Sequence, residues 1–145
     1  MLLSPEIWIP HLQFLLQTIS IMYPMNPNDV SKKKYYDMIN NLPVFFPEKP
    51  MGKYFTKLLD QYPLTPYLKS RESFMRWVHF INNKINIFMN REQETFYDSL
   101  ENYYKAYKPN EIIKQENSKK KKKYIEISII IGTIAFIIYL LKKKE

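Results

Sequence analysis

The chain has 145 residues, 46% of them apolar and 16% aromatic, which is enough for one folded domain with a substantial core. It contains no cysteine, which excludes disulfides, thiol nucleophiles and thiolate metal sites, and its two glycines argue against a glycine-rich phosphate-binding loop. The net charge is +8, but residues 1–117 carry 14 Lys and Arg against 12 Asp and Glu, so the folded part is nearly neutral and a nucleic-acid-binding face has little support.

Prolines divide the first half of the chain into three predicted helices. Pro10 is expected to start the first, because proline fits the first helical turn. The second is expected to be capped by Asp29 or Ser31, and residues 43–50 interrupt the pattern before the third. The three helices are predicted over about 10–22, 29–42 and 51–62. Their expected buried positions, spaced by three and four residues, are Leu12, Leu15, Leu16, Ile19, Tyr35, Met38, Ile39, Leu42, Phe55, Leu58 and Leu59.

The segment 70–90 predicts a fourth helix with two distinct faces. Ser70 is its expected N-cap, and Glu72 lies in the first turn, where the helix dipole favours negative charge. The apolar face comprises Phe74, Trp77, Val78, Ile81, Ile85 and Phe88. A neighbouring stripe comprises His79, Asn82, Asn83 and Asn86. Since asparagine is a mediocre helix former, this stripe is either a row of amides that binds a ligand or a solvated polar face.

A shorter fifth helix is predicted over about 96–107, and residues 108–118 have the composition of a polar linker. The fifth helix places Leu100, Tyr103, Tyr104 and Tyr107 at helical spacing. No segment alternates in the manner of a strand, so the domain is predicted to be an all-α bundle. The predicted division of the chain is a helical domain at 1–108, a polar linker at 109–123, a transmembrane helix at 124–141 and a basic tail at 142–145.

The segment 125–141 predicts a single membrane span. It holds seventeen residues with one charge, Glu126, and at about 1.5 Å per residue it covers roughly 25 Å. Lysine runs at 119–123 and 142–144 flank it, which disfavours a buried core helix. Few residues follow the span and residues 1–9 lack a signal pattern, so we expect a tail-anchored protein with its domain facing the cytosol.

Several short motifs, in this order, resemble the Erv/ALR family of FAD-linked sulfhydryl oxidases from about Trp8 to Lys108. The carriers of the resemblance are Tyr23-Pro24, Pro47 through Phe55, Ser70-Arg71-Glu72, Arg76-Trp77 and Asn82-Asn83-Lys84-Ile85-Asn86. The resemblance implies a four-helix bundle closed by a short fifth helix. It also implies FAD bound beside a Cys-x-x-Cys pair, and usually a homodimer. Several large DNA viruses encode such proteins for disulfide formation during virion assembly.

The same resemblance shows where this sequence departs from the family. The redox cysteines of the family fall on Glu48 and Met51, and a second, structural pair falls on about His79 and Phe96. Disulfide exchange requires a thiolate that attacks a disulfide sulfur, and neither a carboxylate nor a thioether can take that part. The chain is therefore predicted to be unable to oxidise thiols by itself, and it offers neither another catalytic motif nor a metal site.

Candidate FAD contacts follow from the resemblance alone. They fall on Gln17, Tyr23, Asn82, Asn83, Asn86, Arg91 and Tyr103. At other flavin-side positions the family's glycine and tryptophan are replaced by Ile9 and Gln13. Gln17 and Asn82 are expected either to hydrogen-bond a flavin or to satisfy one another inside a repacked core.

Two functions are consistent with these features. The first is a catalytically silent scaffold that binds a partner in a viral disulfide-formation or virion-assembly setting, at a host intracellular or virion membrane. The alternative is a flavoprotein that still binds FAD and acts in the sulfhydryl oxidase pathway with a cysteine-bearing partner.

Overall fold

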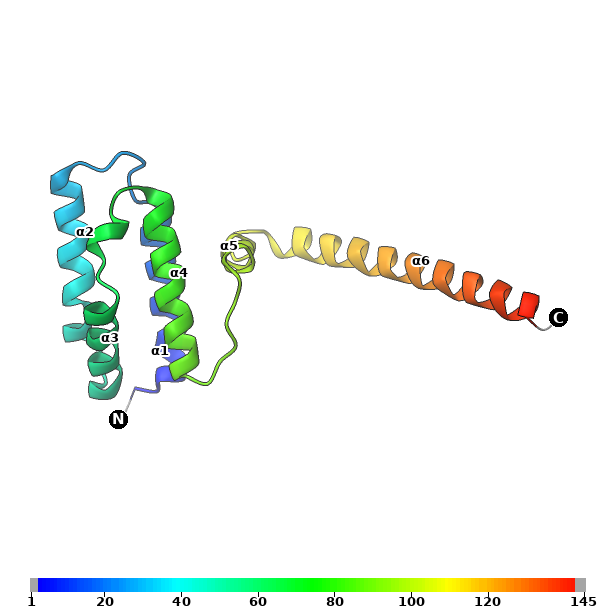
Figure 1. The fold of residues 1–145 in the computed structure, drawn as a ribbon, viewed down its shortest axis with the longest axis horizontal. Helices are drawn as coiled ribbons and strands as arrows, with labels where there is room; N and C mark the ends of the chain where they lie inside the picture. The colour runs from blue at the N-terminus through cyan, green and yellow to red at the C-terminus, as the bar shows by residue number, and fades with distance from the viewer. Residues whose placement is uncertain (1–2, 143–145) are drawn as a thin grey trace. The chain divides into compact units, whose positions relative to one another are not determined.

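The computed structural model describes residues 3–142, apart from the side chains of 110–111, 113, 115–116 and 136–142. Figure 1 shows an all-helical chain, as predicted, with no strand in the described part. The chain divides into one unit that ends at Tyr103 and another that begins at Tyr104. The elements are α1 (Pro5–Ile21), α2 (Asp29–Asn41), the 3-10 helix η1 (Leu42–Phe45), α3 (Lys49–Gln61), the 3-10 helix η2 (Thr65–Tyr67), α4 (Arg71–Phe88), α5 (Phe96–Lys105) and α6 (Asn110–Lys142).

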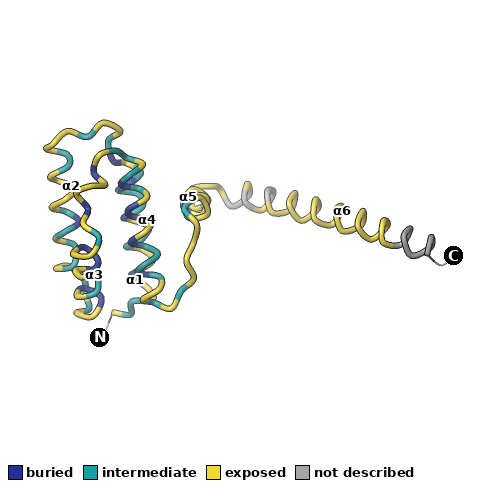
Figure 2. Tube along the Cα trace, viewed as in Figure 1, coloured by how far each residue is buried: buried dark blue, intermediate teal, exposed yellow. Residues whose placement is uncertain are grey.

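The core of the first unit lies between its helices. Helices α1 and α4 share the largest interface among the described elements, and η1 contacts both α2 and α3. Buried residues follow the inward faces of these helices, whereas the outward faces are exposed (Figure 2). The core consists of Ile9, Leu16, Tyr23, Ile39, Met51, Phe55, Leu58, Leu59, Leu64, Leu68, Phe74, Trp77, Val78, Ile81 and Ile85.

The first helix begins at Pro5, so the prediction that Pro10 starts it is wrong. Ser4 is the N-cap, and its backbone oxygen accepts from the amide of Ile7 at 3.1 Å. Pro10 lies inside α1, where it removes one backbone hydrogen bond. Proline has no backbone N–H, which costs no hydrogen bond in the first turn at Pro5 but costs one at Pro10. Burial of the neighbouring Ile9 offsets the cost at Pro10.

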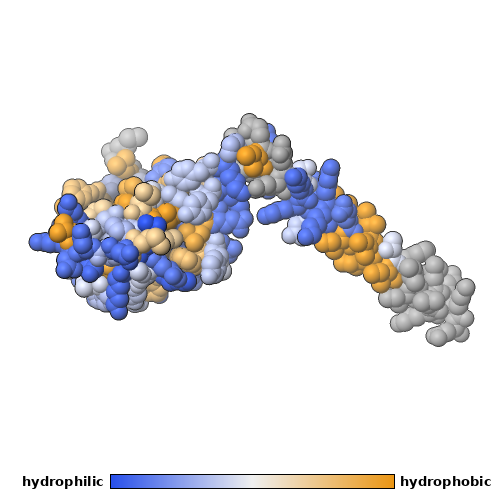
Figure 3. All heavy atoms as spheres, turned by 90° about the horizontal axis from the view of Figure 1, so that it is seen from above, coloured by the Kyte–Doolittle hydropathy of each residue, from blue (hydrophilic) through white to orange (hydrophobic). Residues whose placement is uncertain are grey.

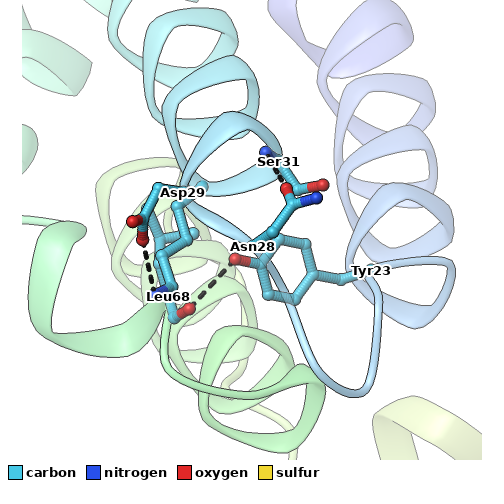
Figure 4. Close-up of polar contacts among 6 residues, drawn as sticks. Tyr23, Asn28, Asp29, Ser31 and Leu68 are labelled. Carbon is cyan, nitrogen blue, oxygen red and sulfur yellow. Dashed lines mark hydrogen bonds and ion pairs between the residues drawn. The ribbon is translucent and has the colours of Figure 1, made fainter.

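Side-chain caps fix the starts of α2 and α4. Asn28 caps α2, with its Oδ1 accepting from the amide of Ser31 at 2.8 Å, so the expectation of Asp29 or Ser31 as the cap is wrong by one residue or more (Figure 4). Ser70 caps α4 as predicted, accepting from the amide of Ser73 at 3.3 Å. Each cap satisfies an amide that the helix itself leaves unpaired.

A left-handed residue ends α4 and turns the chain back along it. Asn90 has φ of 53°, the only positive φ among the described non-glycine residues. Its amide donates to Ile87 at 3.0 Å, and the amide of Arg91 donates to Asn86 at 2.8 Å, which together form a Schellman motif. Asparagine tolerates this conformation better than other residues with a Cβ atom.

Four residues predicted on apolar helix faces are exposed. Leu15 is 52% exposed on α1 and Phe88 is 43% exposed at the end of α4, where its ring stacks on that of Tyr54 with centroids 4.2 Å apart. Tyr104 and Tyr107 are also exposed, although Tyr103 is buried. Each exposed residue lies at the edge of an apolar stripe, so the buried face is narrower than the spacing predicted.

The helix α6 begins at Asn110, so the predicted linker 109–123 is largely helical. Over the described residues, none of the helices has an apolar stretch long enough to cross a membrane. The predicted span extends past Ala135 into side chains that are not described, and residues 143–145 of the predicted tail also lie outside the described part. Figure 3 shows a hydrophilic block on α6 followed by a hydrophobic one.

Replacing Ile81 by alanine is expected to lower the free energy of unfolding by about 2–5 kcal/mol, because Ile81 is 1% exposed and its loss leaves a cavity in the core. Ile87→Ala is the matched control on the same helix, since Ile87 is 47% exposed, and a change within about 0.5 kcal/mol is expected there. Urea denaturation followed by circular dichroism measures both. Equal losses in the two variants would contradict this assignment of the core face.

Candidate functional site

Gln13 joins α1 to α4 through its side-chain amide. Its Nε2 donates to the backbone oxygen of Asn82 at 3.1 Å and to Oδ1 of Asn86 at 2.9 Å. All three residues are half-buried. The predicted cofactor contacts Asn82 and Asn86 therefore lie together, one turn apart on α4 and facing α1.

Gln17 and Tyr103, two other predicted contacts, connect α1 to α5. Gln17 Nε2 donates to the backbone oxygen of Ser99 at 3.1 Å, and the Tyr103 hydroxyl donates to Oγ1 of Thr18 at 3.0 Å. The pairing of Gln17 with Asn82 that we considered is not found. Gln17 instead holds the N-terminal half of α5 against α1.

Two buried polar atoms of these helices have no hydrogen-bond partner among the described residues: Oδ1 of Asn82 on α4 and Nε1 of Trp8 on α1. Leaving a buried donor or acceptor unpaired costs about 1–3 kcal/mol, and most such groups in folded proteins are satisfied. One of these atoms is an acceptor and the other a donor. A ligand that satisfies both would have to donate to Asn82 and accept from Trp8, and a flavin carries groups of both kinds.

Tyr23 does not join this site. Its side chain is fully buried, and its hydroxyl donates to the backbone oxygen of Leu68 at 3.0 Å (Figure 4). Its ring packs edge-on against Tyr35 and Phe74, with centroids 4.7 Å and 5.0 Å away. Tyr23 therefore holds η2, α2 and α4 together at the other end of α1.

Asn83 and Arg91 organise the connection between α4 and α5. The side chain of Asn83 donates to the backbone oxygen of Glu94 at 2.9 Å and accepts from its amide at 3.1 Å. Arg91 Nη2 donates to the backbone oxygen of Glu6 at 3.3 Å. Both side chains thus bind backbone groups. Among the described residues, neither is hydrogen-bonded to another of the predicted cofactor contacts.

The asparagine stripe is not a solvated face. His79, Asn82, Asn83 and Asn86 are all half-buried. Asn83 and Asn86 bind neighbouring segments, which leaves only Asn82 with a buried atom that lacks a partner. Trp8, Thr18 and Ser99 are residues of this part of the fold that sequence reasoning did not include in the site. Trp8 lies four residues before Leu12 on the inward face of α1, which is the one signal that could have pointed to it.

The positions that the resemblance assigns to redox cysteines lie at the start of α3. Glu48 is the N-cap residue, half-buried and without a side-chain capping bond, while Met51 is 2% exposed in the core. Gly52 follows, and a Cβ atom there would meet the backbone oxygen of Pro43 at 3.3 Å. No group of His, Asp and Glu side chains in the described residues is arranged to hold a metal ion.

The positions assigned to the structural cysteine pair are in contact. The rings of His79 and Phe96 meet edge to face with centroids 5.5 Å apart. The Arg76 guanidinium lies 4.6 Å from the centroid of Phe96, and Asn83 Nδ2 lies 3.1 Å from Nε2 of His79. An aromatic and polar cluster therefore ties α4 to the segment before α5.

Comparison with known proteins agrees on one family. The model of the Erv1/Alr family matches residues 14–108. A probable FAD-linked sulfhydryl oxidase of Acanthamoeba polyphaga mimivirus, R368, is 29% identical over 108 residues, which cover 74% of this chain and 76% of that protein.

The same fold is found in solved structures. The yeast Erv1 core has a TM-score of 0.60 at 23% identity, with 65% of this chain and 78% of that one covered. The FAD-binding domain of Erv1 from Saccharomyces cerevisiae gives the same TM-score and identity over 88% of its length. At this identity the likeness concerns the fold.

Protonation of His79 is expected to destabilise the protein. Burial lowers the pKa of His79, and Arg76 adds to this effect, while Glu94 opposes it. The unfolded chain, with a His pKa of about 6.5, therefore binds the proton first, so stability is full above that pH and falls as the pH drops through 6.5 toward the lower folded-state pKa. Denaturant midpoints measured between about pH 7.5 and pH 5.5 check this.

His79→Gln removes the titrating group, and its midpoint is expected to change less over this pH range. His11→Gln is the matched control, because His11 is exposed on α1, and it should keep the pH dependence of the wild type. The attribution to His79 is wrong if both variants keep the full pH dependence.

Proposed function

The chain belongs to the Erv1/Alr family, and we propose that it is a member without thiol oxidase activity that serves as a membrane-bound, partner-binding scaffold. The main support for this proposal comes from the two residues at the positions assigned to the redox cysteines. Glu48 occupies the N-cap position of α3 without a side-chain capping bond, and Met51 is packed in the core, in a chain that has no cysteine. Without a thiolate the chain has no group that exchanges with a substrate disulfide.

The intact fold around these positions supports a retained binding role. The core of α1–α4 is continuous through Met51 and Phe55, and the segment before α5 is held by His79 and Phe96 in place of a cysteine pair. A decaying domain would lose such packing first, because core contacts supply most of its stability. The setting we propose is viral disulfide formation or virion assembly, with a cysteine-bearing protein as the proposed partner, and the relative that supports a viral setting is a probable sulfhydryl oxidase of a virus.

FAD binding is the second candidate function, and the unpaired atoms of Trp8 and Asn82 favour it. Trp8 Nε1 would donate to the cofactor and Asn82 Oδ1 would accept from it, while Gln13 joins α1 to α4 at Asn82 and Asn86. When bound, the flavin would supply two-electron redox chemistry. The chain would then act in the sulfhydryl oxidase pathway with a partner that supplies the thiols.

We also propose that α6 anchors the protein in a host intracellular or virion membrane, with the first unit on the cytosolic side. The described isoleucines from 125 to 134 are all 42–62% exposed, and they face every side of the helix. A helix that is apolar all round is buried in a protein core or lies in a bilayer. The preceding lysines, 119–123, fit the headgroup region of the cytosolic leaflet.

A homodimer is the proposed oligomeric state of the first unit. The outer face of α1 carries an apolar stripe in which Ile7, Leu15 and Met22 are 68%, 52% and 69% exposed. These residues recur at spacings of seven and eight, so they share one side of the helix. A second copy of the same stripe would cover it, and light scattering of the purified protein measures the mass that decides this.

The full-length chain, purified in detergent without added flavin, is expected to show no dithiothreitol-dependent oxygen uptake above the protein-free rate, because it lacks an exchangeable thiol. An oxygen electrode measures this. Uptake driven by the dithiol would overturn the proposal.

The visible spectrum of the same sample tests the second candidate. A yellow protein near one flavin per chain supports it, and Asn82→Leu should then release the flavin while leaving the helical content unchanged. A colourless, folded protein that does not bind added FAD excludes it. Glu48→Cys with Met51→Cys is the positive control, since oxygen uptake is expected from it only when flavin is bound.

Membrane anchoring predicts that the full-length chain stays with membranes after a carbonate wash. Ile130→Lys with Ile134→Lys should move it to the supernatant, because each lysine in the centre of a span costs about 2.5–3.5 kcal/mol. Ile112→Lys, on the same helix but outside the predicted span, is the control and should remain with the membranes. Release of the wild type by the wash would contradict the anchor.

A further inference from the structure

A groove of about 710 Å³ lies between η1 and α3, next to the start of α3. One wall is η1 and the residues after it, which contribute Pro43, Val44, Phe46 and Pro47. The other wall is the outward face of α3. The η1 wall is held from behind, because Phe46 packs on Trp8 and on Phe55 with ring centroids 5.2 Å away in both cases.

The α3 wall carries three lysines in a row. Lys49, Lys53 and Lys57 are exposed, line the groove and follow one another at four-residue spacing. Within the described part of the chain, none of the three forms an ion pair or a side-chain hydrogen bond. Glu48 and Asp60 also line the groove, near the two ends of the lysine row. The lysines outnumber these carboxylates and leave the wall positive.

The η1 wall is apolar and open to solvent. Val44, which lines the groove, and its neighbour Phe45 are each 78% exposed. An apolar wall therefore faces a positive one. Neither wall is covered by another described segment of the chain.

The spacing of the lysines specifies what fits between these walls. Residues four apart on a helix are separated by about 6 Å along its axis, and alternate residues of an extended chain are separated by about 6.6 Å. Side chains of an extended segment point alternately to opposite sides. An extended segment in the groove would thus present every second side chain to the lysines and the intervening ones to Val44 and the prolines.

We propose that the groove between η1 and α3 binds an extended partner segment in which acidic residues alternate with apolar ones, the carboxylates facing Lys49, Lys53 and Lys57. This inference deepens the proposed scaffold function and rests on it. A bilayer surface is flat and contacts protruding side chains, whereas this site is concave with its charges along one wall. A peptide with alternating chemistry matches both walls at once.

The probe is a fluorescein-labelled peptide in which aspartate alternates with valine, titrated with the full-length chain in detergent and followed by fluorescence anisotropy. A peptide of the same composition, with all aspartates first and all valines after, is the matched control. We expect the alternating peptide to bind at least about tenfold more tightly, because only it addresses both walls. Equal affinity for the two peptides, or no binding by either, overturns the proposal.

Matched charge reversals locate the site. Lys53→Glu with Lys57→Glu is expected to weaken binding of the alternating peptide by about tenfold or more, since two attractive contacts become repulsive. Lys33→Glu with Lys34→Glu, two exposed lysines of α2, changes the net charge equally and should leave the affinity within about twofold. Equal losses in both double variants would show a general charge effect and overturn the site.

Two further outcomes are distinguishable. In nanodiscs, shielding of Lys53 and Lys57 from amine-reactive labelling by anionic lipid alone would assign this face to the membrane and overturn the peptide site. The binding assay uses neither thiol nor flavin, so it is independent of the test of the proposed function. A chain that binds the peptide and also consumes oxygen with a dithiol would overturn the scaffold function but keep the groove.

Discussion

The packing of α4 against α1 is the interaction on which the rest of the first unit depends. Both helices bury one apolar face in the other, and Gln13 adds a polar bridge across the interface. Two side-chain hydrogen bonds also join α4 to α3 and its C-terminal end. Trp77 Nε1 donates to the backbone oxygen of Tyr62, and the Tyr54 hydroxyl donates to that of Lys84, both at 3.0 Å. Since α4 also supplies Asn83 to the connection before α5, each neighbouring segment takes its position from this one helix.

The absence of sulfur has a different structural outcome at the two places to which the resemblance assigns cysteine pairs. At the start of α3, Met51 turns inward and becomes part of the core. Before α5, His79 and Phe96 remain in contact, and Arg76 lies over the Phe96 ring. A disulfide in a small domain is worth about 2–5 kcal/mol, which is the range of one or two well-buried aromatic or aliphatic side chains. Ring contacts and a buried thioether can therefore supply a comparable stability without a covalent bond.

The sequence predicted the helical class and the Ser70 cap, because each depends on local spacing or on order along the chain. The sequence-based prediction was wrong where two residues of the same type could take the same structural role. Pro5 and Pro10 have the same local preference, and only the packing of α1 decides that Pro5 starts the helix. For the asparagine stripe the sequence left two alternatives open for a related reason. Its residues have the same composition and spacing, yet Asn83 binds the backbone of Glu94 while Asn82 keeps an unpaired oxygen, a difference set by tertiary contacts.

The contact between His79 and Phe96 has a consequence for where this domain is able to fold. A disulfide forms only in an oxidising environment. A protein that needs one for its fold therefore reaches its stable form in some compartments and remains reduced in others. A ring–ring contact forms wherever water is excluded from it, at any glutathione ratio. The fold of this chain is thus independent of the very chemistry that its relatives perform, and reductants such as those of the cytosol leave it unchanged.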